Sequence, residues 1–170
     1  ATIGVAGSLA PDVMIAETIA HLRSLPDQVE AICAGLTEEQ MRRAPQDGGW
    51  SAIEIICHLR DAAAEEGLRI RRMMEEENPT LAPYDQEAWA AERRYRGEDP
   101  SRALTALRAF WTGLAYQLEH LPPEAWDRRG FHPESGPTSV RERAQRAAEH
   151  ARDHLTQLRS LVAALRPPVS

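Results

Sequence analysis

Two histidines in the C-terminal part of the chain have a spacing that suits metal binding. His150 and His154 are four residues apart, so on a helix their side chains lie on one face with Cβ atoms about 6 Å apart. Two imidazoles in this arrangement can bind one ion at about 2.0–2.1 Å per bond. Ala151 stands where zinc proteases with an H-E-x-x-H motif have their catalytic glutamate. The pair therefore predicts a metal site, but not a protease of that class.

A third histidine lies in a strongly apolar part of the chain. His58 is surrounded by Ile55, Ile56, Cys57 and Leu59, where each buried ring nitrogen needs a partner. One explanation is a core histidine bonded to a backbone carbonyl or a carboxylate. The other is a third metal ligand, and three histidines with the remaining positions open are typical of a catalytic site. Imidazole suits several divalent transition metals, of which we expect zinc or nickel first.

Two acidic residues follow His58 on the same predicted helix. Asp61 lies about one turn beyond it and Glu65 about two turns beyond it. Both can face the site and orient a ligand histidine or a bound water, which makes them our candidate catalytic residues. The alternative is the polar edge of an amphipathic helix. Gln157, one turn past His154, is predicted to support that ligand or to form a dimer contact.

Three short segments together resemble a known family. They are GGWS at 48–51, CHLRD at 57–61 and EHARDHLTQ at 149–157. In these motifs and in its helix order the chain is similar to the DinB-like superfamily, which includes the damage-inducible DinB proteins and the metal-dependent thiol transferases of bacillithiol and mycothiol chemistry. The resemblance implies a four-helix bundle, often dimeric, with a metal site at His58, His150 and His154.

The resemblance also implies an activity. It points to a metal-dependent thiol transferase that acts on a small-molecule substrate with a low-molecular-weight thiol, and to a homodimer. The physical basis is that a metal lowers the pKa of a bound thiol or water, which becomes a nucleophile near neutral pH. A metal-dependent hydrolase is the first alternative. The second is a non-catalytic stress-response or metal-binding module in which the ion mainly stabilises the bundle.

Along most of the chain the apolar residues recur with the period of a helix, so the elements that must position these residues are expected to be helices. An all-α four-helix bundle is expected, as one domain over residues 1–170. The first long helix begins near Pro11, with a kink or break at Pro26 before the apolar stripe continues to Leu36. A short helix follows the capping box that begins at Thr37. The other long helices are expected at about 52–77, 100–121 and 139–165.

The connections between these helices differ in length. Residues 78–99 are predicted to form a long crossover between the second and third long helices, with a short helix over about 86–95. Trp89 and Tyr95 are expected to lie at a pocket mouth there. Residues 122–137 are rich in proline and glycine and are expected to form a loop. Trp50 is predicted to pack as a hydrophobic staple at a helix start, and His132 to be a surface or capping residue.

Composition narrows the function classes. The formal net charge is −6, and the arginines at 69, 71 and 72 are followed at once by glutamates, so nucleic-acid binding is not expected. The chain contains no lysine, which excludes a lysine nucleophile. No apolar stretch reaches the roughly 20 residues of a membrane span. We expect no signal peptide, because the N-terminal segment lacks a charged start and a long apolar run. Cys33 and Cys57 lie in apolar segments, so we expect a cytoplasmic protein with reduced thiols.

Overall fold

Four long helices, each amphipathic, form the body of the molecule. The computed structural model describes residues 11–167. Its long helices are α1 (Pro11–Cys33), α3 (Ala52–Glu75), α5 (Pro100–Glu119) and α6 (Val140–Leu165). The predicted four-helix bundle is confirmed.

Local capping interactions explain where three of these helices begin. The Glu54 carboxylate accepts hydrogen bonds from the backbone N–H and the hydroxyl of Ser51, at 3.1 and 2.8 Å. At the start of α6, the Ser139 hydroxyl accepts from the Glu142 backbone N–H at 3.1 Å. Asp99 caps α5 in the same way. These caps satisfy backbone donors that the first helical turn leaves free.

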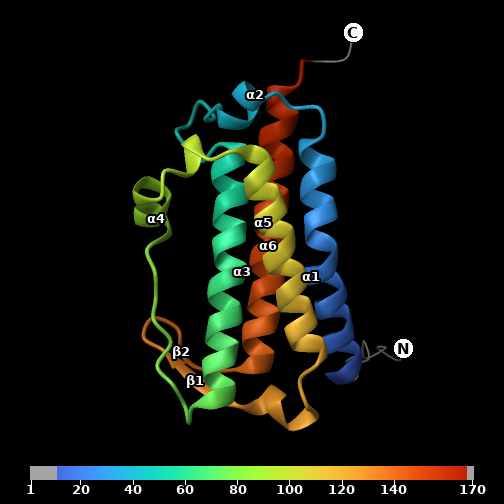
Figure 1. The fold of residues 1–170 in the computed structure, drawn as a ribbon, viewed down its shortest axis with the longest axis vertical. Coiled ribbons are helices and arrows are strands. Elements are labelled where there is room, and N and C mark those ends of the chain that lie inside the picture. The colour runs from blue at the N-terminus through green and yellow to red at the C-terminus, as the bar shows by residue number, and fades with distance from the viewer. Residues whose placement is uncertain (1–10, 168–170) are drawn as a thin grey trace, which may run out of the picture.

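The order of the helices around the bundle brings α3 and α6 together. α3 packs against α5 and α6, and α1 packs against the same two helices on the other side. Figure 1 shows that α3 and α5 run in one direction, whereas α1 and α6 run in the other. The segment between α3 and α5 returns along the outside of the bundle and contains α4 (Gln86–Glu92) and a 3-10 turn, η1 (Tyr95–Gly97).

The first helix is continuous, so the break considered at Pro26 does not occur. Pro26 lies inside α1 without ending it, because Leu22, Leu25 and Val29 on both sides of the proline are fully buried in the core. The helix ends at Cys33, and Leu36 beyond it still packs against the core, as the apolar stripe predicted. Gly35 has a φ of +80°, the left-handed conformation with which many helices end. The short helix α2 (Glu38–Arg42) then begins at the predicted capping box of Thr37.

The segment expected to be a loop contains a small hairpin. A 3-10 turn, η2 (Pro123–Asp127), precedes the antiparallel strands β1 (Arg129–His132) and β2 (Gly136–Ser139). Gly136, with a φ of +83°, permits the turn between the strands. The crossover is attached to this hairpin, since the Leu81 N–H donates to the Phe131 carbonyl at 2.7 Å. The crossover and the hairpin therefore lie together beside one end of α3 (Figure 1).

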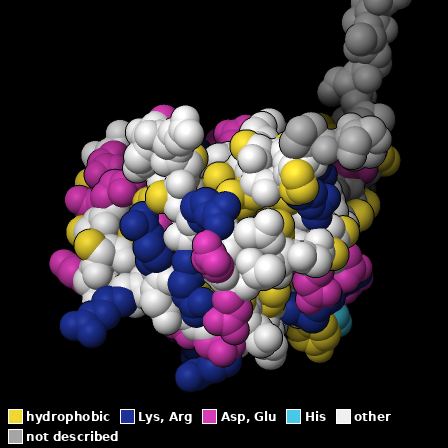
Figure 2. Space-filling view, turned by 90° about the horizontal axis from the view of Figure 1, so that it is seen from above, with side chains coloured by type: hydrophobic (Ala, Val, Ile, Leu, Met, Phe, Trp, Pro, Cys, Tyr) yellow, Lys and Arg dark blue, Asp and Glu magenta, His cyan; other side chains and the backbone are white. Residues whose placement is uncertain are grey.

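Positive and negative side chains are mixed on the face of the molecule that Figure 2 shows. At the end of the bundle that carries α2, arginine and acidic side chains are interspersed (Figure 2), and two ion pairs there join Arg42 to Glu38 and Arg43 to Glu39, both at 2.8 Å. Among the described helices, none is long and apolar enough to cross a membrane.

Candidate metal centre

The three predicted ligand histidines meet between α3 and α6. His150 Nε2 lies 3.0 Å from His58 Nε2 and 2.8 Å from His154 Nε2. Every pair of ligand atoms in the cluster lies within 4.8 Å. Nitrogens bound to one tetrahedral ion at 2.0–2.1 Å would lie about 3.3 Å apart, close to these distances. The structure thus brings together all three residues that the sequence singled out as ligands.

Helix geometry explains how the residues converge. His58 lies in the second turn of α3 and is 1% exposed. On α6, Ala147, Ala148 and Ala151 are buried, and their small side chains let the helix backbone approach its neighbours. The two histidines of α6 lie at the edge of this stripe and are half-buried, so they can reach His58 across the interface between the helices.

The hydrogen-bonding capacity of imidazole tests whether this cluster suits a metal. A ring nitrogen carries either one N–H or one lone pair in the ring plane. His150 Nε2 can therefore form a hydrogen bond with only one of its two neighbouring nitrogens. Three lone pairs directed at one cation satisfy all three rings together. The donor set therefore fits a divalent transition metal, and imidazole does not by itself select zinc or nickel.

Burial keeps these rings in the neutral form that can bind a metal. Burial, followed by the neighbouring histidines, lowers the pKa of His58 to about 3. Burial and His154 lower the pKa of His150 to about 4. Burial also lowers the pKa of His154, although the hydrogen bond to Gln157 opposes the shift. All three histidines are consequently uncharged at neutral pH.

Two further residues contact the cluster. Gln157 Oε1 lies 2.8 Å from His154 Nδ1, which places the proton of that ring on Nδ1 and leaves Nε2 free to bind an ion. Trp50, predicted to be a staple, lies against the histidines, with ring centroids 4.9 Å from His58 and 6.2 Å from His154. Its indole N–H donates to Glu87 of α4 at 3.2 Å. The crossover is thus tied to the site through Trp50.

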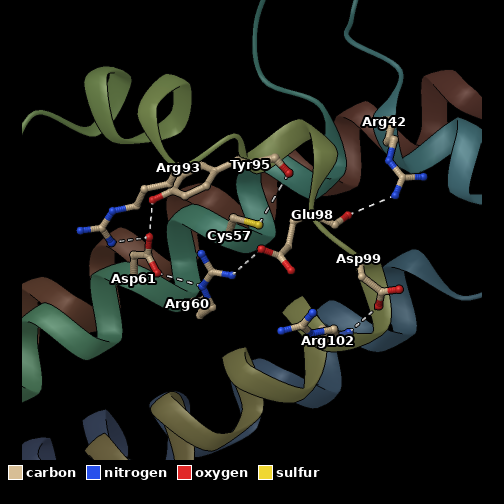
Figure 3. A network of polar contacts seen from close by, with 9 residues as sticks. All are labelled: Arg42, Cys57, Arg60, Asp61, Arg93, Tyr95, Glu98, Asp99 and Arg102. Carbon is tan, nitrogen blue, oxygen red and sulfur yellow. Dashed lines mark hydrogen bonds and ion pairs between the residues drawn. The ribbon is translucent and has the colours of Figure 1, made fainter.

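Asp61, one of the two candidate catalytic residues, binds the crossover. Its carboxylate accepts from Arg60 Nε at 2.8 Å, from Arg93 Nη1 at 3.0 Å and from the Tyr95 hydroxyl (Figure 3). Burial raises the pKa of Asp61, but these three donors outweigh it and the pKa is lowered overall. Asp61 is therefore a charged anchor between α3 and the η1 region. It does not belong to the histidine cluster, and its part in catalysis stays a prediction.

Glu65, the other candidate, lies elsewhere on α3. It is half-buried and borders a surface hollow with Leu68, Arg72 and Glu75. Among the described residues, no carboxylate joins the three histidines. A catalytic role for Glu65 likewise stays a prediction.

A cavity of about 510 Å³ begins at His150. It runs along the interface of α3 and α6, and the crossover and the hairpin close its sides. Its wall is formed by Ala62, Glu66, Arg69, Tyr84, Trp111, His132, Glu134, Ser135, Arg143, Arg146, Ala147 and His150. This volume is in the range of small-molecule sites.

Several of these wall residues differ from the sequence prediction. His132, expected to be a surface or capping residue, is 8% exposed because the hairpin turns it inward, although its Nδ1 does accept the backbone N–H of Glu134 in the hairpin turn. Tyr84 is the crossover residue that lines the wall. Tyr95, which was expected at a pocket mouth, is 1% exposed and its hydroxyl donates a hydrogen bond to Asp61. Trp89 stacks on Tyr84, with the ring centroids 4.3 Å apart.

The helical spacing of some wall residues from the ligand histidines could have predicted their place in the cavity. Glu66 and Arg69 follow His58 by 8 and 11 residues, and Arg146 and Arg143 precede His150 by 4 and 7. These steps keep side chains on the face of their histidine. Tyr84 and His132 had no comparable signal, because their positions depend on the paths of the crossover and the hairpin.

Comparisons with known proteins find relatives over most of the chain. The sequence model of the DinB superfamily matches residues 15–158. A protein of Oceanobacillus iheyensis named "Putative metal-dependent hydrolase OB0782" is 31% identical over 152 residues, which cover 88% of this chain and 87% of that protein. A Bacillus mycoides protein with the same type of name is 27% identical over 157 residues, 91% of this chain and 88% of its own.

A solved structure shares the fold. It is YfiT from Bacillus subtilis, reported as a probable metal-dependent hydrolase with an unusual four-helix bundle topology. The TM-score is 0.85 at 21% identity, over 96% of this chain and 93% of that one. At this identity the similarity supports the fold.

Proposed function

Because the chain belongs to the DinB superfamily, we propose that it is a metal-dependent enzyme in which His58, His150 and His154 hold one divalent ion at the edge of a substrate cavity. The observation that carries this proposal is the convergence of the three Nε2 atoms beside that cavity. A structural ion normally has a closed set of four protein ligands. Here the described residues offer three, and the wall beside His150 is open to a small molecule.

The proposed reaction is transfer of a small thiol to an electrophilic substrate. A divalent ion at these histidines supplies Lewis-acid chemistry, which lowers the pKa of a coordinated thiol or water. The chain itself supplies little help in removing a proton, because Asp61 is held by three donors and Glu66 by Arg143. A thiol, with an ordinary pKa of about 8.5, needs such a base far less than water does. This difference favours a thiol as the nucleophile.

Hydrolysis is the second candidate, favoured by the names of the relatives. In that case His132 of the wall, whose Nδ1 accepts the backbone N–H of Glu134 at 3.2 Å, carries the proton of its neutral ring on Nε2 and can donate that proton to a leaving group. The same three ligands serve both reactions. The two candidates differ only in which nucleophile enters the cavity.

The test uses purified protein loaded separately with zinc and with nickel. Each form is incubated with the fluorogenic electrophile monochlorobimane and, in turn, with cysteine, coenzyme A, bacillithiol and mycothiol. We expect thiol conjugation above the uncatalysed rate, dependent on the metal and abolished in His58→Gln. His120→Gln is the matched control, because His120 is exposed at the end of α5.

The outcomes separate the candidates. Absence of conjugation with every thiol and both metals would refute thiol transfer. Metal-dependent cleavage of 4-nitrophenyl acetate without any thiol, lost in His58→Gln, would then support hydrolysis. If neither reaction occurs in a protein that binds the metal stoichiometrically, the proposed enzymatic role is wrong.

A further inference from the structure

Beyond His150, the cavity has a charged wall that the metal chemistry does not use. Arg69 of α3 and Arg143 and Arg146 of α6 line it, together with Glu66 and the exposed Glu134 of the hairpin turn. Three positive charges therefore face two negative ones. The Arg69 side chain is only 11% exposed.

The partners of these arginines differ sharply. Arg143 is fully neutralised, since its Nε and Nη2 each donate to a Glu66 oxygen at 2.6 Å. Arg69 Nη1 lies 3.6 Å from the same carboxylate, and its Nη2 donates to the Ala82 carbonyl at 2.8 Å. Arg69 Nε is buried without a hydrogen-bond partner. A buried N–H donor without a partner is costly, and Arg69 therefore retains a donor that the described residues do not satisfy.

Arg146 is the more accessible of the two arginines with spare donors. It is exposed, and within residues 11–167 its side chain forms no hydrogen bond or ion pair. Its guanidinium lies at the cavity wall and is therefore not paired with a carboxylate of the described residues. Arg69 and Arg146 together give the cavity unused donors and an excess of positive charge.

The distance from the metal centre limits what can bind there. Arg146 precedes His150 by four residues and Arg69 follows His58 by eleven, so their backbones lie about 6 and 16 Å from those histidines along their helices. A ligand that reaches both the histidine cluster and these arginines must therefore span several bonds. Between the two ends, Trp111, Ala62 and Ala147 line the cavity and offer apolar contact to such a chain.

We propose that this cavity is a subsite for a carboxylate or phosphate group of the substrate, bound by Arg146 and Arg69, with the reacting end of the same molecule at the three histidines. The inference rests on the proposed function, because it assumes that the substrate reacts at a metal held there. Arginine suits this role, since its planar donors match both oxyanions. Arg143 does not bind the anion in this proposal, because it is paired with Glu66 and so joins α6 to α3 in the wall.

The first test examines the cavity without the metal. Metal-free protein is titrated with glutarate and, separately, with inorganic phosphate, while the Arg146 Nε–H signal is followed by ¹⁵N–¹H NMR and assigned by its loss in Arg146→Gln. We expect a saturating shift, and an affinity about tenfold or more lower in Arg146→Gln, measured on the remaining arginine signals. Arg152→Gln is the matched control, because Arg152 is exposed on the same helix and lies outside the cavity wall. The anion that binds more tightly identifies the group.

The second test joins the subsite to the metal. Cobalt-loaded protein is titrated with 4-mercaptobutyrate and with the neutral 1-butanethiol, and the sulfur-to-cobalt charge-transfer band reports binding. We expect the carboxylate to increase affinity about tenfold or more, with this advantage lost in Arg146→Gln and kept in Arg152→Gln.

Failure of this inference differs from failure of the proposed function. If neither anion shifts the Arg146 signal up to 50 mM, or if Arg152→Gln weakens binding as much as Arg146→Gln, the anion subsite is wrong. If both thiols bind cobalt with equal affinity, the subsite is also wrong while the thiol chemistry stands. If neither thiol produces the band but the anions still bind through Arg146, thiol transfer fails and the subsite stands.

Discussion

Removal of His150 should uncouple the stability of the protein from the metal. Its Nε2 is within 3.0 Å of the Nε2 atoms of both other histidines, so His150→Ala removes the nitrogen at the middle of the cluster. The variant keeps only His58 on α3 and His154 on α6. Two imidazoles then remain to hold an ion that three held before.

The expected magnitude follows from linkage. A ligand at 100 times its Kd stabilises the folded state by about 2.7 kcal/mol. In a protein of this size 1 kcal/mol shifts Tm by about 2–4 °C, so the metal should raise the Tm of the unaltered protein by about 5–11 °C. Residues that merely support metal ligands contribute about 10–100-fold to affinity, so loss of a ligand should cost at least about 100-fold. At the same metal concentration the variant then gains about 0.4 kcal/mol, or about 1–2 °C.

The assay is differential scanning calorimetry with and without zinc or nickel. His120→Ala serves as the control, because this exposed histidine of α5 contributes nothing to the cluster and should keep the full metal-dependent shift. The reasoning would be refuted if His150→Ala, with an unchanged helical circular dichroism spectrum, gained as much stability from the metal as the unaltered protein does. It would also be refuted if His120→Ala lost the shift.

The remaining predictions concern the charged and thiol groups near the core. Asp61→Asn should lower the free energy of unfolding in urea by about 3 kcal/mol, because it removes the counter-charge of the partly buried Arg60, 15% exposed, and the charged acceptor of the buried Tyr95 hydroxyl. Since the pKa of Asp61 is lowered in the folded state, this loss should be complete above about pH 5 and shrink below about pH 4 as the unaltered carboxylate is protonated. Glu66→Gln should cost about 3–5 kcal/mol, because Arg143, 7% exposed, would be left unpaired; adding Arg143→Met should recover at least half of the loss in the same urea assay. Burial raises the pKa of Cys33 to about 11 and that of Cys57 to about 12, so neither should react with Ellman's reagent at pH 8 until guanidinium exposes both.

Each of these has a contrary result that would count against it. An Asp61→Asn loss that grows toward acid pH would contradict the lowered pKa. A double variant no more stable than Glu66→Gln alone would mean that the ion pair is not the source of the loss. Rapid labelling of one native thiol would show that its segment opens to solvent.

Much of the fold was predictable because it depends on local chemistry. The caps at Ser51 and Asp99 are read from a few neighbouring residues, and they determine where α3 and α5 begin. Helical periodicity identified the apolar face of each helix and therefore the bundle. The spacing of His150 and His154 was informative for the same reason, since the helical repeat places residues four apart on one face. The sequence also indicated His58 by its apolar surroundings.

The tertiary structure decided what each polar residue near the histidines contacts. One helical turn places Asp61 on the same side of α3 as His58, but the path of the crossover delivers Arg93 and Tyr95 to its carboxylate. Likewise the hairpin turns His132 inward, and the packing of α3 on α6 pairs Arg143 with Glu66. Such contacts join residues far apart in the chain, so they depend on the rotation and register of packed elements. A short window of sequence carries the helical period, which is local, but it does not carry the relative placement of two helices and two connections that together form the cavity.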